Sequence, residues 1–322
     1  MGFNPKSEIR NPQLEHITVL LRETVDLIQP RPGGVYLDGT LGGGGHAEEL
    51  LRRTGPDGIV IGLDQDEGAL VRAAERLSPF GTRAVVRREN FRNAAEALAD
   101  LGLEAIDGAI LDLGLSWFHL RTPERGFSFQ TDGPLDMRMD QRTRSTAADL
   151  VNTLPRQELT RILREYGEEK KAALIAKAIE KARTRGPITS TVQLAEIVSS
   201  VFPPYPPRRI HPATLSFQAL RIAVNDEMNT LAAGLEDLIR LLRPGGRIAV
   251  ISFHSLEDRI VKQSFVEHAK TCICPPKFPQ CRCGKRADLL IVTKRPISAS
   301  EAEIASNPAS RSAKLRAAEK VG

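Results

Sequence analysis

Residues 36–51 read YLDGTLGGGGHAEELL and carry the pattern that decides the fold. A short apolar run closes on Asp38, four glycines follow, and the residues after the histidine have helical spacing. A glycine-rich turn between a strand and a helix lets backbone amides approach a ligand closely. Gly42, Gly44 and Ala47 also fit the G-x-G-x-x-A dinucleotide fingerprint, which alone is a weak signal. The segment therefore predicts a nucleotide-binding strand, turn and helix.

The charge of Asp38 narrows the choice of ligand. A phosphate is the default ligand of such a loop at a helix N-terminus. A carboxylate about 4 Å from a unit charge interacts by roughly 4 kcal/mol at an effective dielectric constant of about 20, favourably with a cation and unfavourably with a phosphate. Few nucleosides carry a positive charge and no phosphate, and S-adenosylmethionine, with its sulfonium and ammonium groups, is the common one. We therefore expect S-adenosylmethionine in this site, with NAD as the alternative.

Around this segment the sequence alternates strands and helices. Apolar strands are predicted within 34–40, 58–66, 83–90 and 106–114, and helical patterns lie between them. Four successive strand-helix units imply a parallel sheet covered by helices on both faces. The fold class predicted is thus α/β, Rossmann-like, with a mainly parallel sheet.

The alternation then stops and resumes near the end of the chain. Residues 121–215 show helical periodicity broken by the proline-rich FPPYPPRR, which predicts an inserted all-helical domain. The α/β domain would then consist of residues 1–120 and 216–322. In its second part we expect a long amphipathic segment with one apolar stripe from Phe217 to Leu242, then the strand RIAVISF, the helix SLEDRIVKQSFVEHA and the strand DLLIVTK.

Composition excludes several classes of protein. With 322 residues, 41% hydrophobic and 26% charged, the chain is typical of globular proteins and not of disordered or collagen-like ones. No apolar run approaches the roughly 20 residues of a membrane span, and the polar start lacks the core of a signal peptide. We expect a cytoplasmic protein. The net charge is +5, and residues 121–221 hold 17 Lys and Arg against 11 Asp and Glu, which suits a solvated helical surface or an anionic partner such as nucleic acid.

Three further candidates follow predicted strands. Asp64 lies 20 residues beyond Gly44, where an acid accepts the ribose hydroxyls of a nucleoside; alternatively, Asp64 or Asp66 caps the next helix. Phe91 falls where an adenine would lie, or it packs in the core. Asp112 ends the fourth strand at the carboxyl edge, where open α/β sheets bind ligands.

Longer motifs extend the pattern over nearly the whole chain. In order they are HITVLL, DGTLGGGGH, ERGFSF, GPLDMRMD, YGEEK, HPATLSFQALRIAVN, SFHSLEDRIVK and NPASRSAKLRAAEK. Together they closely resemble the RsmH family, also called MraW, of class I S-adenosylmethionine-dependent methyltransferases. The resemblance implies methyl transfer to the exocyclic N4 of a cytosine in the decoding region of 16S ribosomal RNA, within the small ribosomal subunit.

The resemblance also implies a set of cofactor contacts, with Asp38 as the wall of the site. The residues carried over are Gly44, Gly45, His46, Asp64, Phe91 and Asp112. The chain departs from the family after DLG: where a serine pair, a variable residue and a glutamine are usual, it reads LSWFHL. His119 takes the glutamine's place and is able to donate one hydrogen bond to the cofactor. At Leu215 the family usually has arginine, so one RNA or structural contact is missing.

Two residues are candidates for catalysis. The N4 amine of cytosine is a poor nucleophile because its lone pair is delocalised into the ring, so positioning must contribute much of the catalysis. We hypothesise that Asp112, or a backbone carbonyl beside it, accepts hydrogen bonds from that amine. His254, after the fifth strand, is the second candidate, as a proton acceptor or an RNA contact. Its alternative role is to cap the helix that begins at SLED.

The predicted insertion holds the candidates for RNA contact. Six of its cations could meet phosphates, or are plain surface charges: Arg142, Arg144, Lys170, Lys171, Arg208 and Arg209. In GPLDMRMD, Asp136, Arg138 and Asp140 form either an internal salt-bridge network or a lid over the cofactor. Two other functions stay open: methylation of another nucleic-acid amine, and a catalytically silent binder of S-adenosylmethionine and RNA in ribosome assembly.

All four cysteines lie in CICPPKFPQCRCG, as two C-x-C pairs. They are Cys272, Cys274, Cys281 and Cys283. Because a reducing cytoplasm disfavours disulfides, the cluster suggests a structural zinc site with four thiolate ligands. The C-x-C spacing is less diagnostic than C-x-x-C, so free thiols and a redox role are alternatives. No catalytic metal is expected.

Overall fold

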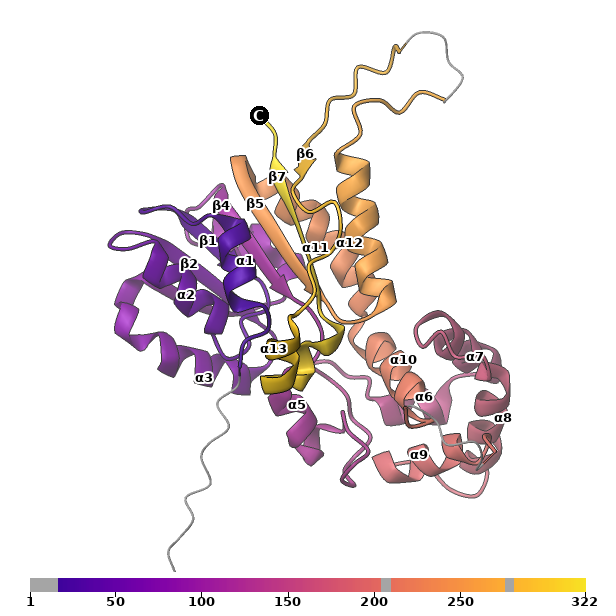
Figure 1. The fold of residues 1–322 in the computed structure, drawn as a ribbon. Coiled ribbons are helices and arrows are strands. Elements are labelled where there is room, and N and C mark those ends of the chain that lie inside the picture. Colours follow the sequence, from indigo (N-terminus) through magenta and orange to yellow (C-terminus); the bar gives the residue numbers. More distant parts are fainter. Residues whose placement is uncertain (1–16, 204–209, 276–280) are drawn as a thin grey trace, which may run out of the picture.

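The structure, a computed structural model, describes residues 17–203, 210–275 and 281–322 (Figure 1). Seven strands form one sheet in the order β3-β2-β1-β4-β5-β7-β6. The strands are β1 Val35–Asp38, β2 Ile59–Asp64, β3 Ala84–Arg88, β4 Ile106–Asp112, β5 Leu242–Ser252, β6 Leu289–Ile291 and β7 Lys314–Lys320. The pairs among β1 to β5 are parallel, and β7 lies antiparallel between β5 and β6. The predicted mainly parallel α/β sheet is confirmed.

Helices cover both faces of the sheet, each over its own apolar core. One face is covered by α1 Leu21–Ile28, α2 Gly45–Arg53 and α3 Glu67–Leu77. The other is covered by α4 Ala94–Ala99, α11 Glu227–Leu241 and α12 Ser255–His268. Leu50 of α2 and Leu235 of α11 are fully buried, one on each side. Strands buried on both faces explain the nearly continuous apolar runs of the sequence.

The sequence pattern does not predict a strand at 314–320, yet β7 forms there. KLRAAEK has one large apolar residue, Leu315, which is fully buried. Ala317 and Ala318 are also fully buried but too small to make a strong period-two pattern. Arg316 looks exposed from its type, but it is 8% exposed and its Nε donates to Asp258 at 2.6 Å. Pairing with strands on both sides stabilises a segment of weak intrinsic pattern.

The middle of the chain forms a group of helices with a separate core. They are α6 Ala147–Thr153, α7 Arg156–Glu165, α8 Ala172–Arg183, α9 Thr191–Ser199 and α10 Thr214–Asn225. Figure 1 shows them gathered to one side of the sheet. These helices lie where the sequence predicts an inserted helical domain. Because Phe217 and Leu220 of α10 pack into its core, the packing continues past the boundary predicted at residue 215.

Two helices share the apolar stripe of the long amphipathic segment from Phe217 to Leu242. α10 ends at Asn225 and α11 begins at Glu227, with Asp226 between them at φ 48°. Aspartate tolerates this left-handed conformation better than most residues. The two halves of the stripe serve different cores, since Leu220 packs in the insertion and Leu235 against the sheet.

Candidate active site

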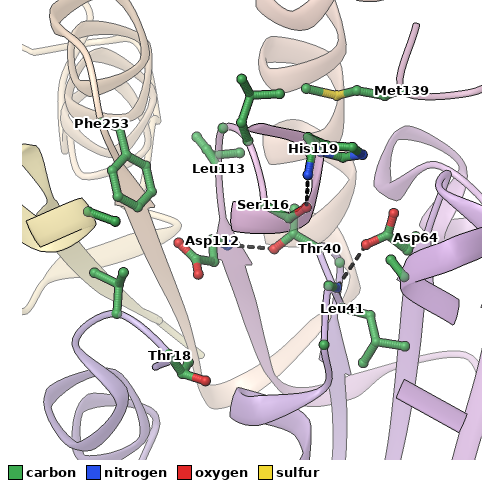
Figure 2. A pocket seen from close by; sticks show the side chains of 18 of the residues that line it. Thr18, Thr40, Leu41, Asp64, Asp112, Leu113, Ser116, His119, Met139 and Phe253 are labelled. Atoms are coloured by element: carbon green, nitrogen blue, oxygen red, sulfur yellow. Dashed lines mark hydrogen bonds between the residues drawn. The ribbon is translucent and has the colours of Figure 1, made fainter. Parts of the chain in front are cut away.

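A cavity of about 500 Å³ opens at the carboxyl edge of β1, β2 and β4 (Figure 2). It is lined by the glycine loop, by the segment after β4 and by the start of α11. Residues 306–309, at the end of α13 Glu301–Ser306, also line it. Among the predicted site residues it includes Gly45, His46, Asp64, Phe91, Asp112 and His119. Parallel strands bring their carboxyl ends to one edge, so residues far apart in sequence meet here.

The glycines of the loop differ in what surrounds them. Gly42 adopts φ 52°, and its N–H donates to Asp64 Oδ2 at 2.8 Å. A Cβ on Gly45, the first residue of α2, would collide with the hydroxyl of Thr18. Gly44, at φ 79°, faces α3, where a Cβ would lie 3.4 Å from Ala73. Gly44 thus serves helix packing and, in the part of the chain described, does not line the cavity.

Asp38 lies beneath the loop and, among the described residues, is not part of the cavity lining. Its side chain is 1% exposed, and its Oδ1 accepts from the N–H of Thr40 at 3.2 Å. Burial raises the pKa of Asp38 to about 7, and nearby Asp64 adds to the rise. Its Oδ2 has no hydrogen-bond partner within the described residues. Asp38 ends β1 as expected, but its carboxylate lies beneath the described lining and does not form the surface of the cavity.

The sequence left two roles open for Asp64 and Asp66, namely ribose binding and capping of α3. Asp64 lines the cavity, and its Oδ1 accepts from the N–H of Asp66 at 2.8 Å. Burial raises the pKa of Asp64. Asp66 is the N-cap of α3, with Oδ1 accepting from the N–H of Ala69 at 2.8 Å. The N-cap alternative therefore holds for Asp66, and Asp64 is left facing the cavity.

Asp66 also binds His119, the residue that stands where the family usually has glutamine. His119, in the short helix α5 Trp117–Arg121, places Nε2 3.1 Å from Asp66 Oδ2. Arg125 binds the same oxygen, and this arginine was not among the predicted site residues. Although burial opposes them, the hydrogen bonds from His119 and Arg125 hold the pKa of Asp66 below its ordinary value. His119 Nδ1 is buried without a hydrogen-bond partner in the described structure. A carboxylate only accepts, so Nε2 carries the proton and neutral His119 presents an acceptor at Nδ1.

Phe91 packs in the core and also borders the cavity. Its side chain is 7% exposed, belongs to the core on the α11 face and lines the cavity with its remaining surface. A Cβ on Gly234 of α11 would lie 2.5 Å from the ring, so that glycine makes room for it. The aromatic side chain is therefore fixed in place by packing before any ligand binds.

Asp112 has the most unusual environment of the cavity carboxylates. Its N–H donates to Thr40 Oγ1 at 2.6 Å, and its Oδ2 lies 4.0 Å from Nδ1 of His46. Burial raises the pKa of Asp112 well above its ordinary value, with Asp38 and Glu257 adding to the effect. Its Oδ1 is buried and has no hydrogen-bond partner among the described residues. Such a group favours a cation or a hydrogen-bond donor as its neighbour.

His46 is positioned from its other side. Its Nε2 lies 3.2 Å from the carbonyl oxygen of Val19, so this nitrogen donates and the neutral ring has its acceptor at Nδ1. The side chain is 3% exposed and lines the cavity. The carbonyl of Val19 therefore orients the imidazole ring of His46, which borders Asp112.

His254 caps α12, which is the alternative to a catalytic role. Its Nδ1 accepts from the N–H of Glu257 at 3.4 Å, and Nε2 lies 3.1 Å from Glu257 Oε1. Glu257 lines the cavity, whereas His254 is outside the lining formed by the described residues. Arg221 lies 3.4 Å from His254 Nε2 and forms two hydrogen bonds, of 2.8 and 2.7 Å, with Glu227. Arg221, Glu227 and Glu257 were not predicted from the sequence, although HPATLSFQALRIAVN contains Arg221 and SLED contains Glu257.

The segment GPLDMRMD is both an internal network and a border of the cavity. Arg138 pairs with Asp136 at 2.7 Å, and the Arg138 Nη1 donates to the carbonyl of Thr143 at 2.7 Å. Met139 lines the cavity, and its N–H donates to Asn225 at 2.7 Å. The segment therefore joins the insertion to the site.

The candidate phosphate contacts differ in how far they are already paired. Arg142 binds Asp140 at 2.8 Å, and Lys171 donates to the carbonyl of Val201 at 3.1 Å. Arg144 and Lys170 are exposed. Arg208 and Arg209 lie outside the described residues.

The order of the strands, the antiparallel β7 and the carboxylates around a glycine loop together define a class I S-adenosylmethionine-dependent methyltransferase. The chain belongs to the MraW methylase family, whose model matches residues 13–321. This membership removes the NAD alternative. No helix in the described part of the chain is long and apolar enough to cross a membrane.

Relatives match over nearly their whole length. A protein of Carboxydothermus hydrogenoformans named ribosomal RNA small subunit methyltransferase H is 53% identical over 309 residues, or 96% of this chain and 99% of its own. One of the same name from Symbiobacterium thermophilum is 54% identical over 307 residues, covering 95% and 96%. A solved rRNA methylase structure from Streptococcus thermophilus aligns over 95% of this chain and 99% of its own. The sequence identity is 12% and the TM-score is 0.44.

Proposed function

We propose that this chain transfers a methyl group from S-adenosylmethionine to the N4 amine of a cytosine in the decoding region of 16S ribosomal RNA. Relatives more than 50% identical over nearly the whole chain carry a small-subunit ribosomal RNA methyltransferase name. The choice of cytosine N4 rests on the motifs that resemble the family. The observation that carries the chemistry is Asp112, whose buried Oδ1 has no hydrogen-bond partner among the described residues.

The residues present suit a cationic nucleoside. Asp38 and Asp112 are both buried, each carboxylate has an oxygen without a hydrogen-bond partner in the described structure, and Asp38 contributes to the raised pKa of Asp112. Two such acids are stabilised by a positive neighbour, and a phosphate would be repelled. The sulfonium and ammonium groups of S-adenosylmethionine supply that charge, which supports the cofactor over a dinucleotide.

Other residues would hold the neutral parts of the cofactor. Both oxygens of Asp64 accept backbone N–H groups, and each retains a lone pair for a ribose hydroxyl. Phe91 offers a fixed apolar wall for the adenine. His119 Nδ1, as an acceptor, suits the exocyclic amine of adenine, whereas the family's glutamine offers both a donor and an acceptor.

Asp112 is proposed to orient and activate the acceptor amine. When bound, S-adenosylmethionine supplies an electrophilic methyl group: the bond from sulfur to methyl breaks as the bond from methyl to N4 forms, and N4 loses one proton. As an acceptor, the Asp112 carboxylate, whose side chain is 20% exposed, would hold an N–H of the amine and draw the lone pair out of conjugation with the ring. Burial and the neighbouring acids raise the pKa of Asp112, so its carboxylate is a stronger base than an exposed one.

His254 is proposed to position and not to touch the reacting atoms. It lies behind Glu257, which borders the cavity, and its Nε2 holds Oε1 of that glutamate at 3.1 Å. Although burial opposes them, the hydrogen bond from His254 and the charge of Arg221 lower the pKa of Glu257. Glu257 therefore stays ionised, and its charge helps to raise the pKa of Asp112.

The insertion is proposed to present the RNA. It borders the cavity through Met139 and carries exposed Arg144 and Lys170. Such cations position a nucleic acid through its phosphates, while the base is recognised in the pocket.

The first experiment is methyl transfer from labelled S-adenosylmethionine to assembled small subunits that lack the modification, followed by nucleoside analysis. N4-methylated cytidine is the expected product. Methylation of a different atom would favour the alternative nucleic-acid amine. Intact cofactor binding without transfer to subunits or to free RNA would favour the silent binder, and the segment from 115 to 120 would then be the first place to look.

A further inference from the structure

The four cysteines lie on an arm between α12 and β6, remote from the cavity. Figure 1 shows this arm extending from the end of α12 on the side of the sheet away from α5 and α13. At its base, the N–H of Asp288 donates to the carbonyl of His268 at 2.8 Å, and their side chains meet at 3.2 Å. Beyond that base, each of the two described segments of the arm carries a C-x-C pair.

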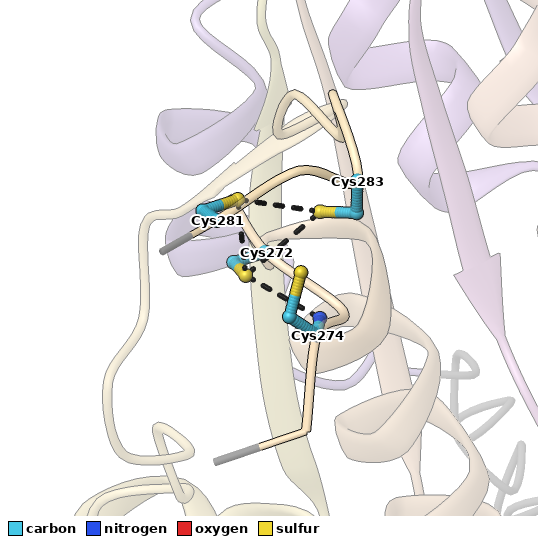
Figure 3. Close-up of side chains that lie close together, drawn as sticks. All are labelled: Cys272, Cys274, Cys281 and Cys283. Atoms are coloured by element: carbon cyan, nitrogen blue, oxygen red, sulfur yellow. Dashed lines mark hydrogen bonds between the residues drawn. The ribbon is translucent and has the colours of Figure 1, made fainter. Parts of the chain in front are cut away.

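The sulfur atoms converge although their residues are exposed or half-buried (Figure 3). All four Sγ atoms lie within 4.8 Å of one another. The distance from Cys272 to Cys281 is 3.4 Å, from Cys281 to Cys283 3.6 Å, and from Cys272 to Cys283 3.8 Å. A tetrahedral zinc ion with bonds of about 2.3 Å to sulfur places its ligands about 3.8 Å apart. The cluster therefore has the size of a site for one ion.

The surroundings of the sulfurs also suit thiolates. The N–H of Ile273 donates to Cys283 Sγ at 3.4 Å, and the N–H of Cys274 donates to Cys272 Sγ at 3.4 Å. Such donors stabilise sulfur that carries negative charge, as ligands on a metal do. Four thiolates on one divalent ion leave a net charge of −2, and the described arm adds cations nearby at Lys270, Arg282, Lys285 and Arg286.

We propose that Cys272, Cys274, Cys281 and Cys283 bind one structural zinc ion. The alternatives match the geometry less well. Disulfides need sulfur atoms about 2.05 Å apart and join two pairs, whereas here three sulfurs are mutually close. A cluster of several irons spreads its thiolates further apart than one ion does. Four protein ligands complete the tetrahedron, so no position is left for a substrate, and the site is structural.

The ion would give the arm an order that its apolar contacts do not provide. Ile273 is 59% exposed, and the arm holds together mainly by polar contacts at its base. Fixing each residue costs conformational entropy, and metal binding is a common source of compensation in segments without a core. Removing zinc should therefore loosen the arm and leave the α/β body folded.

The test starts with zinc content. The untagged protein, purified without chelator from a zinc-supplied culture, should hold close to one equivalent by elemental analysis. Cys272→Ser and Cys283→Ser should each lose it, while melting of the body and S-adenosylmethionine binding stay unchanged. The matched control is His254→Gln, because Glu227, His254 and Glu257 form a second group with metal-binding side chains, and this variant should keep its zinc.

Cobalt replacement gives a second readout. Cobalt(II) bound by four thiolates shows intense visible bands and a near-ultraviolet charge-transfer band, and both should vanish in Cys283→Ser. Chelation should expose the peptide bonds after Arg282, Lys285 and Arg286 to trypsin and leave the body intact. The proposal is overturned by less than a tenth of an equivalent of zinc in fresh protein, by bound iron with sulfide, by disulfides in the intact mass, or by zinc that persists in the cysteine variants.

Discussion

Among the individual residues, Asp112 carries the largest share of the proposed chemistry, because its Oδ1 is dehydrated and has no partner among the described residues. Asp112→Asn keeps the shape and removes the charge. We expect the rate of methyl transfer to fall by about 10²-fold or more, the range typical of a positioned acid or base. Nucleoside analysis under single-turnover conditions measures the rate.

Asp100→Asn, at an exposed position after α4, is the control for the loss of one charge. The folded state should persist in both variants. Among the described residues, Asp112 Oδ1 has no hydrogen bond that the change to asparagine would break. An Asp112→Asn enzyme with the rate of wild type would remove this residue from the mechanism.

The raised pKa of Asp38 predicts how cofactor affinity depends on pH. Burial raises this pKa to about 7, and a cation binds the ionised carboxylate better than the neutral acid. Below pH 7, binding of the sulfonium must release a proton, so affinity for S-adenosylmethionine should fall as pH falls, by up to tenfold per unit. Above pH 7 the contribution of Asp38 to this dependence should level off. Calorimetry from pH 5.5 to 8.5 measures both.

Two comparisons isolate the charge. S-adenosylhomocysteine has no charge on sulfur and should show a smaller slope over the same pH range. Asp38→Asn should flatten the slope for S-adenosylmethionine, leaving the remainder that comes from Asp112, whose pKa is raised in the same direction. Equal slopes for the two ligands would contradict the proposed role of Asp38 as an electrostatic wall.

Residues were predictable from sequence where one local pattern placed them. Asp64 and Asp112 end apolar strands, and the parallel fold alone brings them to one edge. The hydrogen bond from His119 to Asp66 spans 53 positions, and no local pattern encodes it. Asp38 was predicted at the wall but lies beneath it, since spacing fixes the end of a strand but not the depth of its side chain.

At the scale of elements, the start of α2 depends on the contact between the glycine loop and the turn before α1. A Cβ on Gly45 would collide with the Thr18 hydroxyl, whereas one on Gly43 would meet nothing within 4 Å. Gly45→Ala should therefore lower the free energy of unfolding by about 1–3 kcal/mol, the usual cost of overpacking. Gly43→Ala, also outside the left-handed region, should leave stability near that of wild type.

The double variant Gly45→Ala with Thr18→Ala tests the cause. It removes the hydroxyl and should recover part of the loss, because the Thr18 Cβ itself lies 3.0 Å from the added atom. Urea unfolding measures each variant. Equal stability of Gly43→Ala and Gly45→Ala would show that the loop moves away from Thr18 at no cost.

The junction of α10 and α11 is held by an ion pair. The Arg221 and Glu227 side chains are each 12% exposed and share two hydrogen bonds across the turn at Asp226. Arg221→Met should destabilise the fold by about 3–5 kcal/mol, because it leaves the acid buried without its partner. Adding Glu227→Gln should restore much of that loss, as measured by thermal unfolding. No recovery in the double variant would place the role of Arg221 in its contact with His254 instead.

Elements were predictable where their periodicity was strong. The four βα units follow from long apolar runs, but β7 depends on Leu315 and two alanines and forms because β5 and β6 flank it. The break at Asp226 was missed because the same apolar stripe continues on both sides of it while facing two different cores. Tertiary packing decided both cases, and tertiary packing is not a local property of the sequence.

For the whole molecule, the two cores imply a division of labour. The sheet, its loops and the start of α11 line the cavity, and the insertion borders it through Met139 and through Asn225 at the end of α10. A surplus of cations in the insertion would then act at a distance from the chemistry. RNA affinity and the chemical step should accordingly be separable by mutation.

The dependence of RNA binding on salt tests this division. If exposed Arg144 and Lys170 contact phosphates, Arg144→Ala and Lys170→Ala should each weaken binding and lower the slope of log affinity against log salt by about 0.7–0.9. Single-turnover transfer at saturating RNA should stay unchanged. Arg161→Ala is the matched control, because that guanidinium already pairs with Glu158 at 3.0 Å and Glu165 at 2.8 Å. Should Arg161→Ala change the slope as much as the other two, the effect would belong to net charge, and the insertion would lose its assigned RNA contacts.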